Sequence, residues 1–197
     1  MTTNEKILND LRLSKKRYLH TMGVVACTKE LAKRHFPLLS TEKLETAALL
    51  HDFTKELSVE EQKALCQKYN IAITAEDEKI PKLFHGKTAA AIAIHEYSAD
   101  EETASAIYYH TTGRANMTDM ETVLFFADYI EDYRTDKACI DVRKYYEKCL
   151  KQEDKHLIAL KKGVLYSFDT TIKHILDKKE LISYTTIEAR NSLLEDL

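Results

Sequence analysis

The run Ala47-Ala48-Leu49-Leu50-His51-Asp52 ends an apolar stretch on two side chains that often bind metals. A helix start at Ser40 or Thr41 precedes it, so the polar pair lies at the end of a short, largely buried helix. A buried carboxylate needs a partner or a metal. Successive helix positions point about 100° apart, so His51 and Asp52 cannot face one point equally. The pair could, however, reach two neighbouring metal ions.

Composition predicts an all-α chain. Of 197 residues only 4 are Gly and 2 are Pro, whereas sheet-rich folds use both types in their many turns. Hydrophobic residues make up 44% and charged residues 31%, which is typical of a folded protein with a core. No repeat or linker divides the chain. We therefore predict a single domain of residues 1–197, with core motifs in 14–134 and C-terminal helices of 138–197 packing on it.

Charge and cysteine usage exclude several functions. The net charge of −3 leaves no basic excess for a nucleic-acid backbone. The four cysteines form no Cys-x-x-Cys pair, which argues against a disulfide framework and a thiolate zinc site. There is neither a signal-peptide pattern nor an apolar stretch of about 18 residues. These features predict a cytoplasmic protein that binds neither nucleic acid nor membrane.

Capping patterns predict where helices begin. Ser14 opens a helix that runs to about Phe36, and Pro81 opens one that runs through Tyr97. Segments 138–150 and 153–178 are also expected to be helical. Four capping boxes predict further starts, namely Ser58–Glu61, Ser98–Glu101, Thr118–Glu121 and Thr185–Glu188.

Other metal-ligand residues lie on faces that should be buried. His20 continues at helical spacing into Val24, and His85 into Ala89. His110 precedes the polar loop of residues 111–116, and Asp128 interrupts an otherwise apolar segment. A lone inward histidine is often a hydrogen-bonded core residue, and a lone buried aspartate is often a helix cap. The six candidates that share this oddity are His20, His51, Asp52, His85, His110 and Asp128.

The order of these motifs resembles the HD-domain metallohydrolase superfamily and, within it, the YqeK family of symmetrical bis(5′-nucleosyl)-tetraphosphatases. The most specific blocks are His110-Thr111-Thr112-Gly113-Arg114 and Ala127-Asp128-Tyr129-Ile130-Glu131. The closing Thr186-Ile187-Glu188-Ala189-Arg190-Asn191 is also similar to that family. Lys87-Thr88 departs from the commoner family residues, which puts a substrate role for Lys87 in doubt. The resemblance implies an all-helical HD bundle with the metal site at its centre.

The resemblance also implies a ligand set for two metal ions. Asp52 would bridge the two metals, and His85 and His110 would complete the second one. The first metal would be held by His20, His51, Asp52 and Asp128. Iron is the metal that the family implies, while manganese and zinc also suit a nitrogen and oxygen ligand set.

The implied reaction is the symmetrical cleavage of diadenosine tetraphosphate into two ADP by a metal-bridging hydroxide. Asp52, Lys55 and Arg134 are the predicted catalytic residues. An anionic tetraphosphate needs cations and hydrogen-bond donors around it. The predicted substrate-binding residues are Arg17, Lys55, Thr111, Arg114, Arg134, Arg190 and Asn191.

Three alternatives stay open. The same fold and metals could serve another nucleotide phosphohydrolase or a phosphodiesterase. The chain could instead be a non-catalytic module that senses nucleotides, or a helical scaffold without metal. The expected partners are a dinucleoside polyphosphate substrate and the ADP product. The sequence leaves open whether the protein forms a homodimer.

Overall fold

The computed structural model describes residues 2–197, and the described residues form helices and no strand. The all-α prediction is therefore confirmed. The helices are α1 (Thr3–Asp10), α2 (Lys15–His35), α3 (Thr41–Leu50), α4 (Val59–Lys68), α5 (Ala75–Lys79), a 3₁₀ turn (Pro81–Leu83), α6 (Phe84–Tyr97), α7 (Glu101–Tyr109), α8 (Asp119–Ile130), α9 (Lys137–Gln152), α10 (His156–Asp177) and α11 (Tyr184–Glu195).

Most predicted helix starts are confirmed by side-chain caps. The hydroxyls of Ser14, Ser58 and Thr118 each accept a hydrogen bond from the backbone three residues on. Pro81 begins a short 3₁₀ turn, and the α-helix starts only at Phe84. Two short helices, α1 and α5, were not predicted, although Thr2 and Thr74 open both with complete capping boxes.

Two predicted starts are wrong. Ser98 ends α6 in the left-handed conformation (φ 57°), and the Asp100 side chain caps α7 instead. Ser98 and Asp100 both lie close enough to the helix start to cap it, and the carboxylate is the one used. The last helix follows Ser183, so Thr185 lies inside its first turn.

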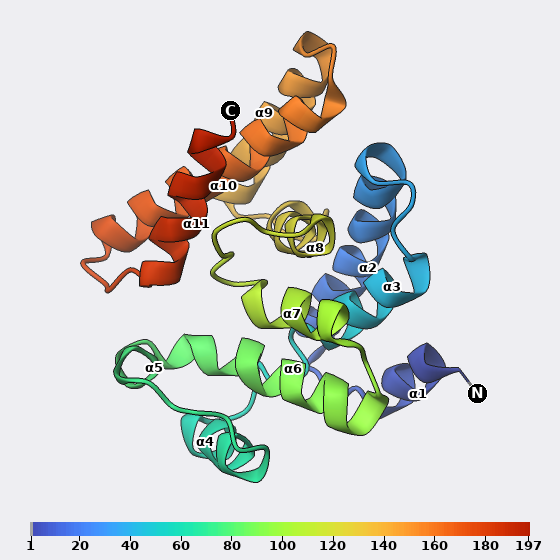
Figure 1. Cartoon of the computed structure of the whole chain (residues 1–197), viewed down its shortest axis with the longest axis vertical. Helices are drawn as coiled ribbons and strands as arrows, with labels where there is room; N and C mark the ends of the chain where they lie inside the picture. Colours follow the sequence, from blue (N-terminus) through green and yellow to red (C-terminus); the bar gives the residue numbers. More distant parts are fainter. Residues whose placement is uncertain (1) are drawn as a thin grey trace.

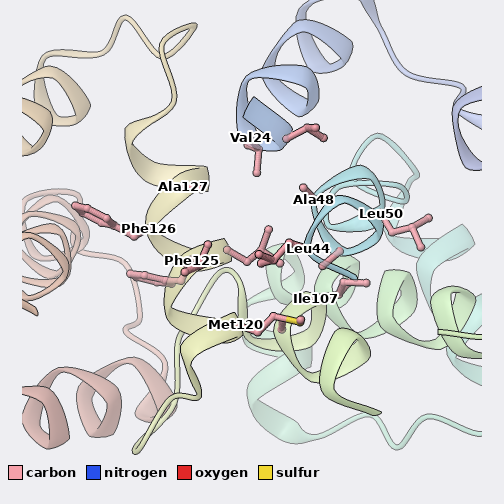
Figure 2. Close-up of a cluster of buried hydrophobic side chains, with 14 of the residues drawn as sticks. Val24, Leu44, Ala48, Leu50, Ile107, Met120, Phe125, Phe126 and Ala127 are labelled. Carbon is pink, nitrogen blue, oxygen red and sulfur yellow. The ribbon is translucent and has the colours of Figure 1, made fainter. Parts of the chain in front are cut away.

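The helices at the centre of the molecule form the core (Figure 1). Helices α2, α3, α7 and α8 face one another there, while α9 and α10 form an antiparallel pair to one side with α11 against α10. Figure 2 shows Val24, Leu44 and Ile107 in the apolar interior between these central helices, whereas Phe125 of α8 points to the other side. There its ring stacks on Phe168 of α10. The same buried cluster reaches from Ile7 of α1 to Ala189 of α11.

A glycine sets the spacing between α6 and α7. A Cβ atom on Gly86 would lie 2.8 Å from the carbonyl oxygen of Tyr108, closer than real Cβ contacts. The two backbones can approach this closely only because residue 86 has no side chain. Gly86 follows His85, and Tyr108 lies two residues before His110, so this contact brings the two histidines together.

No helix among residues 2–197 has both the length and the apolar character needed to cross a membrane.

Candidate metal centre

The six predicted ligand residues converge, although each comes from a different place in the fold. His20 lies on α2, His85 in the first turn of α6 and Asp128 near the end of α8. His51 and Asp52 directly follow α3, and His110 directly follows α7. The side chains of five of the six are nearly or fully buried, and that of Asp128 is 18% exposed.

One half of the cluster surrounds the Oδ2 atom of Asp52. The Nε2 atoms of His51 and His20 lie 3.4 Å and 3.6 Å from it. Oδ1 of Asp128 lies 2.9 Å from His20 Nε2 and 3.7 Å from His51 Nε2. His20, His51 and Asp52 could hold one metal ion, with Asp128 beside them.

The other half surrounds the Oδ1 atom of Asp52. Nε2 of His85 lies 3.3 Å from it, and Nε2 of His110 lies 3.6 Å from it. These three residues form a second group that could hold a metal ion. Asp52 belongs to both groups, and each of its oxygens faces a different one. The arrangement is that of a carboxylate placed between two neighbouring metal positions.

Hydrogen bonds fix which nitrogen of each imidazole faces the cluster. The Nδ1 atoms of His51, His85 and His110 lie 2.6–2.7 Å from the backbone carbonyls of Ala48, Lys82 and Ile107. A carbonyl only accepts, so Nδ1 must carry the proton and donate. In the neutral ring Nε2 is then an acceptor with a free lone pair. All three histidines thus present lone pairs to the cluster.

This donor set fits cations. Nε2 of His85 and Nε2 of His110 lie only 3.0 Å apart, and two lone pairs at that distance repel each other unless a cation or proton lies near them. Oδ1 of Asp52 is buried and has no hydrogen-bond partner in the described chain, although unsatisfied buried oxygens are rare. Imidazole and carboxylate ligands without thiolate suit iron, manganese or zinc.

The electrostatics favour the protonation states that bind metals. Burial would raise the pKa of the Asp52 carboxyl, but the surrounding imidazoles and the Lys55 ammonium outweigh it and hold the pKa well below its usual range. Burial opposes ionisation of Asp128 too, yet the Arg134 guanidinium holds its pKa far down. Burial, with Lys55 adding to it, lowers the pKa of His85. The carboxylates are therefore ionised and His85 is neutral.

Glu131 is a residue of the site that the sequence prediction did not single out. Its buried carboxylate lies 3.0 Å from Nδ1 of His20, the outer nitrogen of that ring. Carboxylates often orient metal-binding histidines in this way. Burial lowers the pKa of His20, but Asp128 and Glu131 outweigh burial and raise it. A Cβ atom on Gly23 would lie 2.1 Å from Glu131 Oε2, so Gly23 leaves the space that Glu131 fills.

Three predicted cations line the cluster. Nη1 of Arg17 lies 2.5 Å from Asp52 Oδ2, and Nη2 of Arg134 lies 2.7 Å from Asp128 Oδ1. Nζ of Lys55 lies 3.0 Å from His85 Nε2 and 3.8 Å from Asp52 Oδ1. All three side chains are 27–31% exposed, so they link the buried ligands to the surface from which an anion would approach.

The other predicted substrate residues divide into two groups. Oγ1 of Thr111 lies 3.2 Å from His85 Nε2 and 3.1 Å from His110 Nε2, so it touches the cluster. Arg114 instead pairs with the buried Glu121 on α8, and Arg190 pairs with Asp169 on α10. Asn191 follows Arg190 on α11 and is exposed. The structure does not bring these last three to the cluster.

Known proteins share this fold and sequence. A model of the HD domain family matches residues 17–133. Three relatives are named symmetrical bis(5′-nucleosyl)-tetraphosphatase, among them those of Bacillus subtilis and Halalkalibacterium halodurans. That of Bacillus subtilis is 37% identical over 142 residues, which cover 72% of this chain and 75% of that protein. That of Halalkalibacterium halodurans is 30% identical over 185 residues, which cover 92% of this chain and 91% of that protein.

A solved structure agrees with these relatives. The crystal structure of a Clostridium acetobutylicum protein, described as a predicted HD superfamily hydrolase involved in NAD metabolism, matches with a TM-score of 0.83 and 35% identity. The match covers 99% of this chain and 96% of that one. From the matched model and the relatives' identity over most of their length, the chain belongs to the HD-domain family, in the YqeK-like group of symmetrical bis(5′-nucleosyl)-tetraphosphatases.

Proposed function

We propose that this protein is a two-metal phosphohydrolase that cleaves diadenosine tetraphosphate symmetrically into two ADP. The observation that carries the proposal is Asp52, whose two oxygens face two adjoining groups of histidines. A structural metal site is usually closed and holds one ion, whereas adjoining sites are typical of phosphate-ester and anhydride hydrolysis. The names of the relatives support the substrate.

Each proposed ligand would have a defined part. His20, His51, Asp52 and Asp128 would hold the first metal ion, and Asp52, His85 and His110 would hold the second. When bound, the two ions supply activation of water and neutralisation of phosphate charge. Iron is our proposal for the native metal, and manganese and zinc have compatible ligand preferences.

The basic side chains would orient the substrate. Arg17, Lys55 and Arg134 surround the cluster on its partly exposed side, where they would bind non-bridging phosphate oxygens. Charge that develops on the leaving ADP is best stabilised by cations already in place. Thr111 would donate a hydrogen bond to phosphate. The structure does not place Arg114, Arg190 or Asn191 at the cluster. They could bind substrate only if the bound substrate extends beyond the cluster.

The test combines metal analysis with product identification. The purified protein, loaded with iron or manganese under reducing conditions, is incubated with diadenosine tetraphosphate and, separately, with NAD. We expect about two metal ions per chain and ADP as the only nucleotide product from the tetraphosphate. A mixture of AMP and ATP would contradict symmetrical cleavage. Preferential NAD hydrolysis would favour a dinucleoside diphosphate substrate, in line with the description of the Clostridium acetobutylicum protein.

Two alanine variants sharpen this test. Asp52→Ala should abolish turnover and lower the occupancy of both metals, since Asp52 belongs to both groups. His95→Ala is the matched control, because His95 is exposed on α6 and stacks on Tyr69 away from the cluster. A large loss of activity in the control would mean that the wrong histidines were chosen. Nucleotide binding without turnover under any metal would favour a sensor.

The proposed location is the cytoplasm. All four cysteines are free, and unpaired thiols suit a reducing compartment.

A further inference from the structure

A small cavity adjoins the metal-facing side of the cluster. Its volume is about 190 Å³, and its walls come from α5, the 3₁₀ turn, α6, α7, the loop after α7 and the start of α11. Thr111 lies in its wall and also touches the Nε2 atoms of His85 and His110. These nitrogens face the proposed metal positions. The cavity therefore lies on the side of the cluster where a substrate would contact the metals. We refer to it as the Thr111 cavity.

A larger cavity lies near the cluster, behind the His20 ring, on the side that faces away from the proposed metal positions. Its volume is about 430 Å³, and Glu131 forms part of its wall. Glu131 contacts Nδ1 of His20, the nitrogen that faces away from the metal position. A molecule bound there would be separated from the metals by the His20 ring. The Thr111 cavity is therefore the better placed of the two for part of the substrate.

The charges in the Thr111 cavity do not suit a phosphate. Lys87 is the cation among its described lining residues, and its Nζ lies 2.6 Å from the buried carboxylate of Asp77. Glu76, also in the wall, accepts a hydrogen bond from the backbone N–H of Tyr184. With Lys87 paired and a second acid present, the cavity offers no net positive charge. An uncharged group would enter it more readily than an anion.

The wall does suit a nucleoside. Most of its residues carry hydroxyls, including Ser183 and Thr185, and a hydroxyl can both donate to and accept from a ribose or base. The Thr112 hydroxyl donates to the carbonyl of Gly113 and can still accept. Tyr108 adds an aromatic ring on which a base can stack. The volume is below the roughly 300–1,000 Å³ of sites that enclose a whole ligand, so the cavity would take one part of a larger substrate.

We propose that the Thr111 cavity binds one nucleoside of the dinucleotide. This inference rests on the proposed function. Symmetrical cleavage places the central phosphates at the metals, so each nucleoside lies two phosphates away, and a cavity one residue from the cluster is at a suitable place. Ser183 and Thr185 lie outside residues 17–133, which match the HD domain. The segment at the start of α11 would thus contribute nucleoside specificity to a metal centre built by the HD domain.

The test is to fill the cavity from α11. Thr185→Phe places a large ring in the wall, and Thr41→Phe is the matched control, since Thr41 is an exposed threonine in the first turn of α3. For each protein we would measure kcat and KM for diadenosine tetraphosphate and inhibition by ADP and by inorganic tripolyphosphate, which has no nucleoside. Thermal unfolding would confirm that both variants fold.

In Thr185→Phe we expect the KM and the ADP inhibition constant to rise about tenfold, with kcat and tripolyphosphate inhibition changed by less than about twofold. Equal weakening of ADP and tripolyphosphate, or no change in either, would overturn the proposal. Calorimetric binding of ADP separates this outcome from failure of the proposed function. If the wild type yields no ADP from the tetraphosphate but binds ADP in a Thr185-dependent way, only the proposed function fails.

Discussion

At the scale of single residues, the hydrogen bond made by Nδ1 of each histidine determines how good a metal ligand its Nε2 is. Three of the four rings are held by backbone carbonyls at helix ends, and His20 is held by the Glu131 carboxylate instead. A carboxylate makes an imidazole a more basic ligand than a carbonyl does. The first metal position should therefore depend on Glu131 more than on any backbone contact.

Replacing Glu131 with Gln should weaken metal binding without displacing the ligands. The amide has the same size, but it lacks the charge that supports His20 Nδ1. We expect metal affinity to fall about 10–100-fold, measured by competition with a chelator of known affinity. Gly23→Ala should have a similar effect, because its Cβ would lie 2.1 Å from Glu131 Oε2 and displace the carboxylate.

A double variant and a control make the Glu131 prediction specific. If Gly23 acts through Glu131, the two changes together should cost little more than either alone. Glu30→Gln is the matched control, because Glu30 is an exposed glutamate on the same helix as His20. Unchanged metal affinity in Glu131→Gln would show that Glu131 does not position His20. Full additivity in the double variant would show that Gly23 does not act through Glu131.

The ligand candidates could be predicted from sequence because each one is a polar residue on an apolar face. Asp128, for example, stands in an apolar segment in which Phe126, Ala127 and Ile130 are buried. Glu131 escaped notice because it follows the end of α8, where a charged residue is ordinarily solvated. The motif contained the residue, but its burial depends on Gly23 from another helix. Such a contact has no local signal.

At the scale of elements, the turn between α8 and α9 carries two residues of the site. Glu131 holds His20 and Arg134 holds Asp128. One side chain of α9 ties this turn together. Nε of Arg143 donates to the carbonyl of Ile130 at 2.7 Å, and its Nη2 donates to the carbonyls of Glu131 and Arg134. The guanidinium thus supplies a donor to the Ile130 carbonyl at the end of α8 and to two carbonyls of the turn that follows.

Arg143→Met should therefore loosen both the turn and the metal site. We expect the free energy of unfolding to fall by about 2 kcal/mol and the metal affinity to fall as well. Arg143→Lys keeps the charge but not the planar fork, so it should restore only part of either loss. Urea unfolding and metal titration would measure the two effects.

Arg34→Met is a suitable comparison for Arg143→Met. Arg34 lines the same cavity as Arg143, but it is exposed near the end of α2. It should change stability by no more than about 0.5 kcal/mol. If Arg143→Met matched it in both stability and metal affinity, the turn would not need its guanidinium.

Element boundaries were predictable where one residue alone could act as the cap. Thr118 had no competitor and begins α8 as predicted. Ser98 and Asp100 are both possible caps within the same few residues, and Ser98 adopts the left-handed conformation that ends α6. Helix α5 has only five residues, too few for an apolar stripe to be visible in the sequence.

At the scale of the whole molecule, sequence reasoning could name the candidate ligands but could not show that they lie close together. Their convergence depends on how α2, α3, α6, α7 and α8 cross, and on close contacts such as that of Gly86 with α7. Arg114 shows the corresponding limit. It neighbours the ligand motif in sequence, yet it turns toward Glu121 because that buried carboxylate needs a partner. Sequence proximity to a motif did not predict proximity in space.

One contact between the C-terminal helices and the rest of the molecule involves a histidine. His35 at the end of α2 lies with its Nε2 2.5 Å from the hydroxyl of Tyr146 on α9. Burial, together with Arg34 and His156, lowers the pKa of His35 to about 4. In the unfolded chain a histidine ionises near pH 6.5. His35 is therefore neutral in the folded protein over a pH range in which it would be protonated in the unfolded chain.

Acidification should therefore destabilise the whole protein. Between pH about 6.5 and about 4 the unfolded chain binds a proton at His35 that the folded chain does not, so the free energy of unfolding falls as the pH falls. We expect the loss to be about 1–2 kcal/mol, because the ring is half-buried and solvent screens part of the effect. His35→Gln keeps an acceptor for Tyr146 without titrating, so its stability should decline less over this range.

Calorimetry of the metal-free protein at a series of pH values would measure the loss. Subtracting the His35→Gln series isolates the contribution of His35, because the four histidines of the metal-ligand cluster are present in both proteins. His174→Gln, at an exposed position of α10, should follow the wild type. Because one buried cluster spans α1 to α11, we propose that residues 1–197 unfold as one domain, in a single transition at each pH. A second transition that alone moved with pH would separate α9–α11 from the HD region and contradict the single domain.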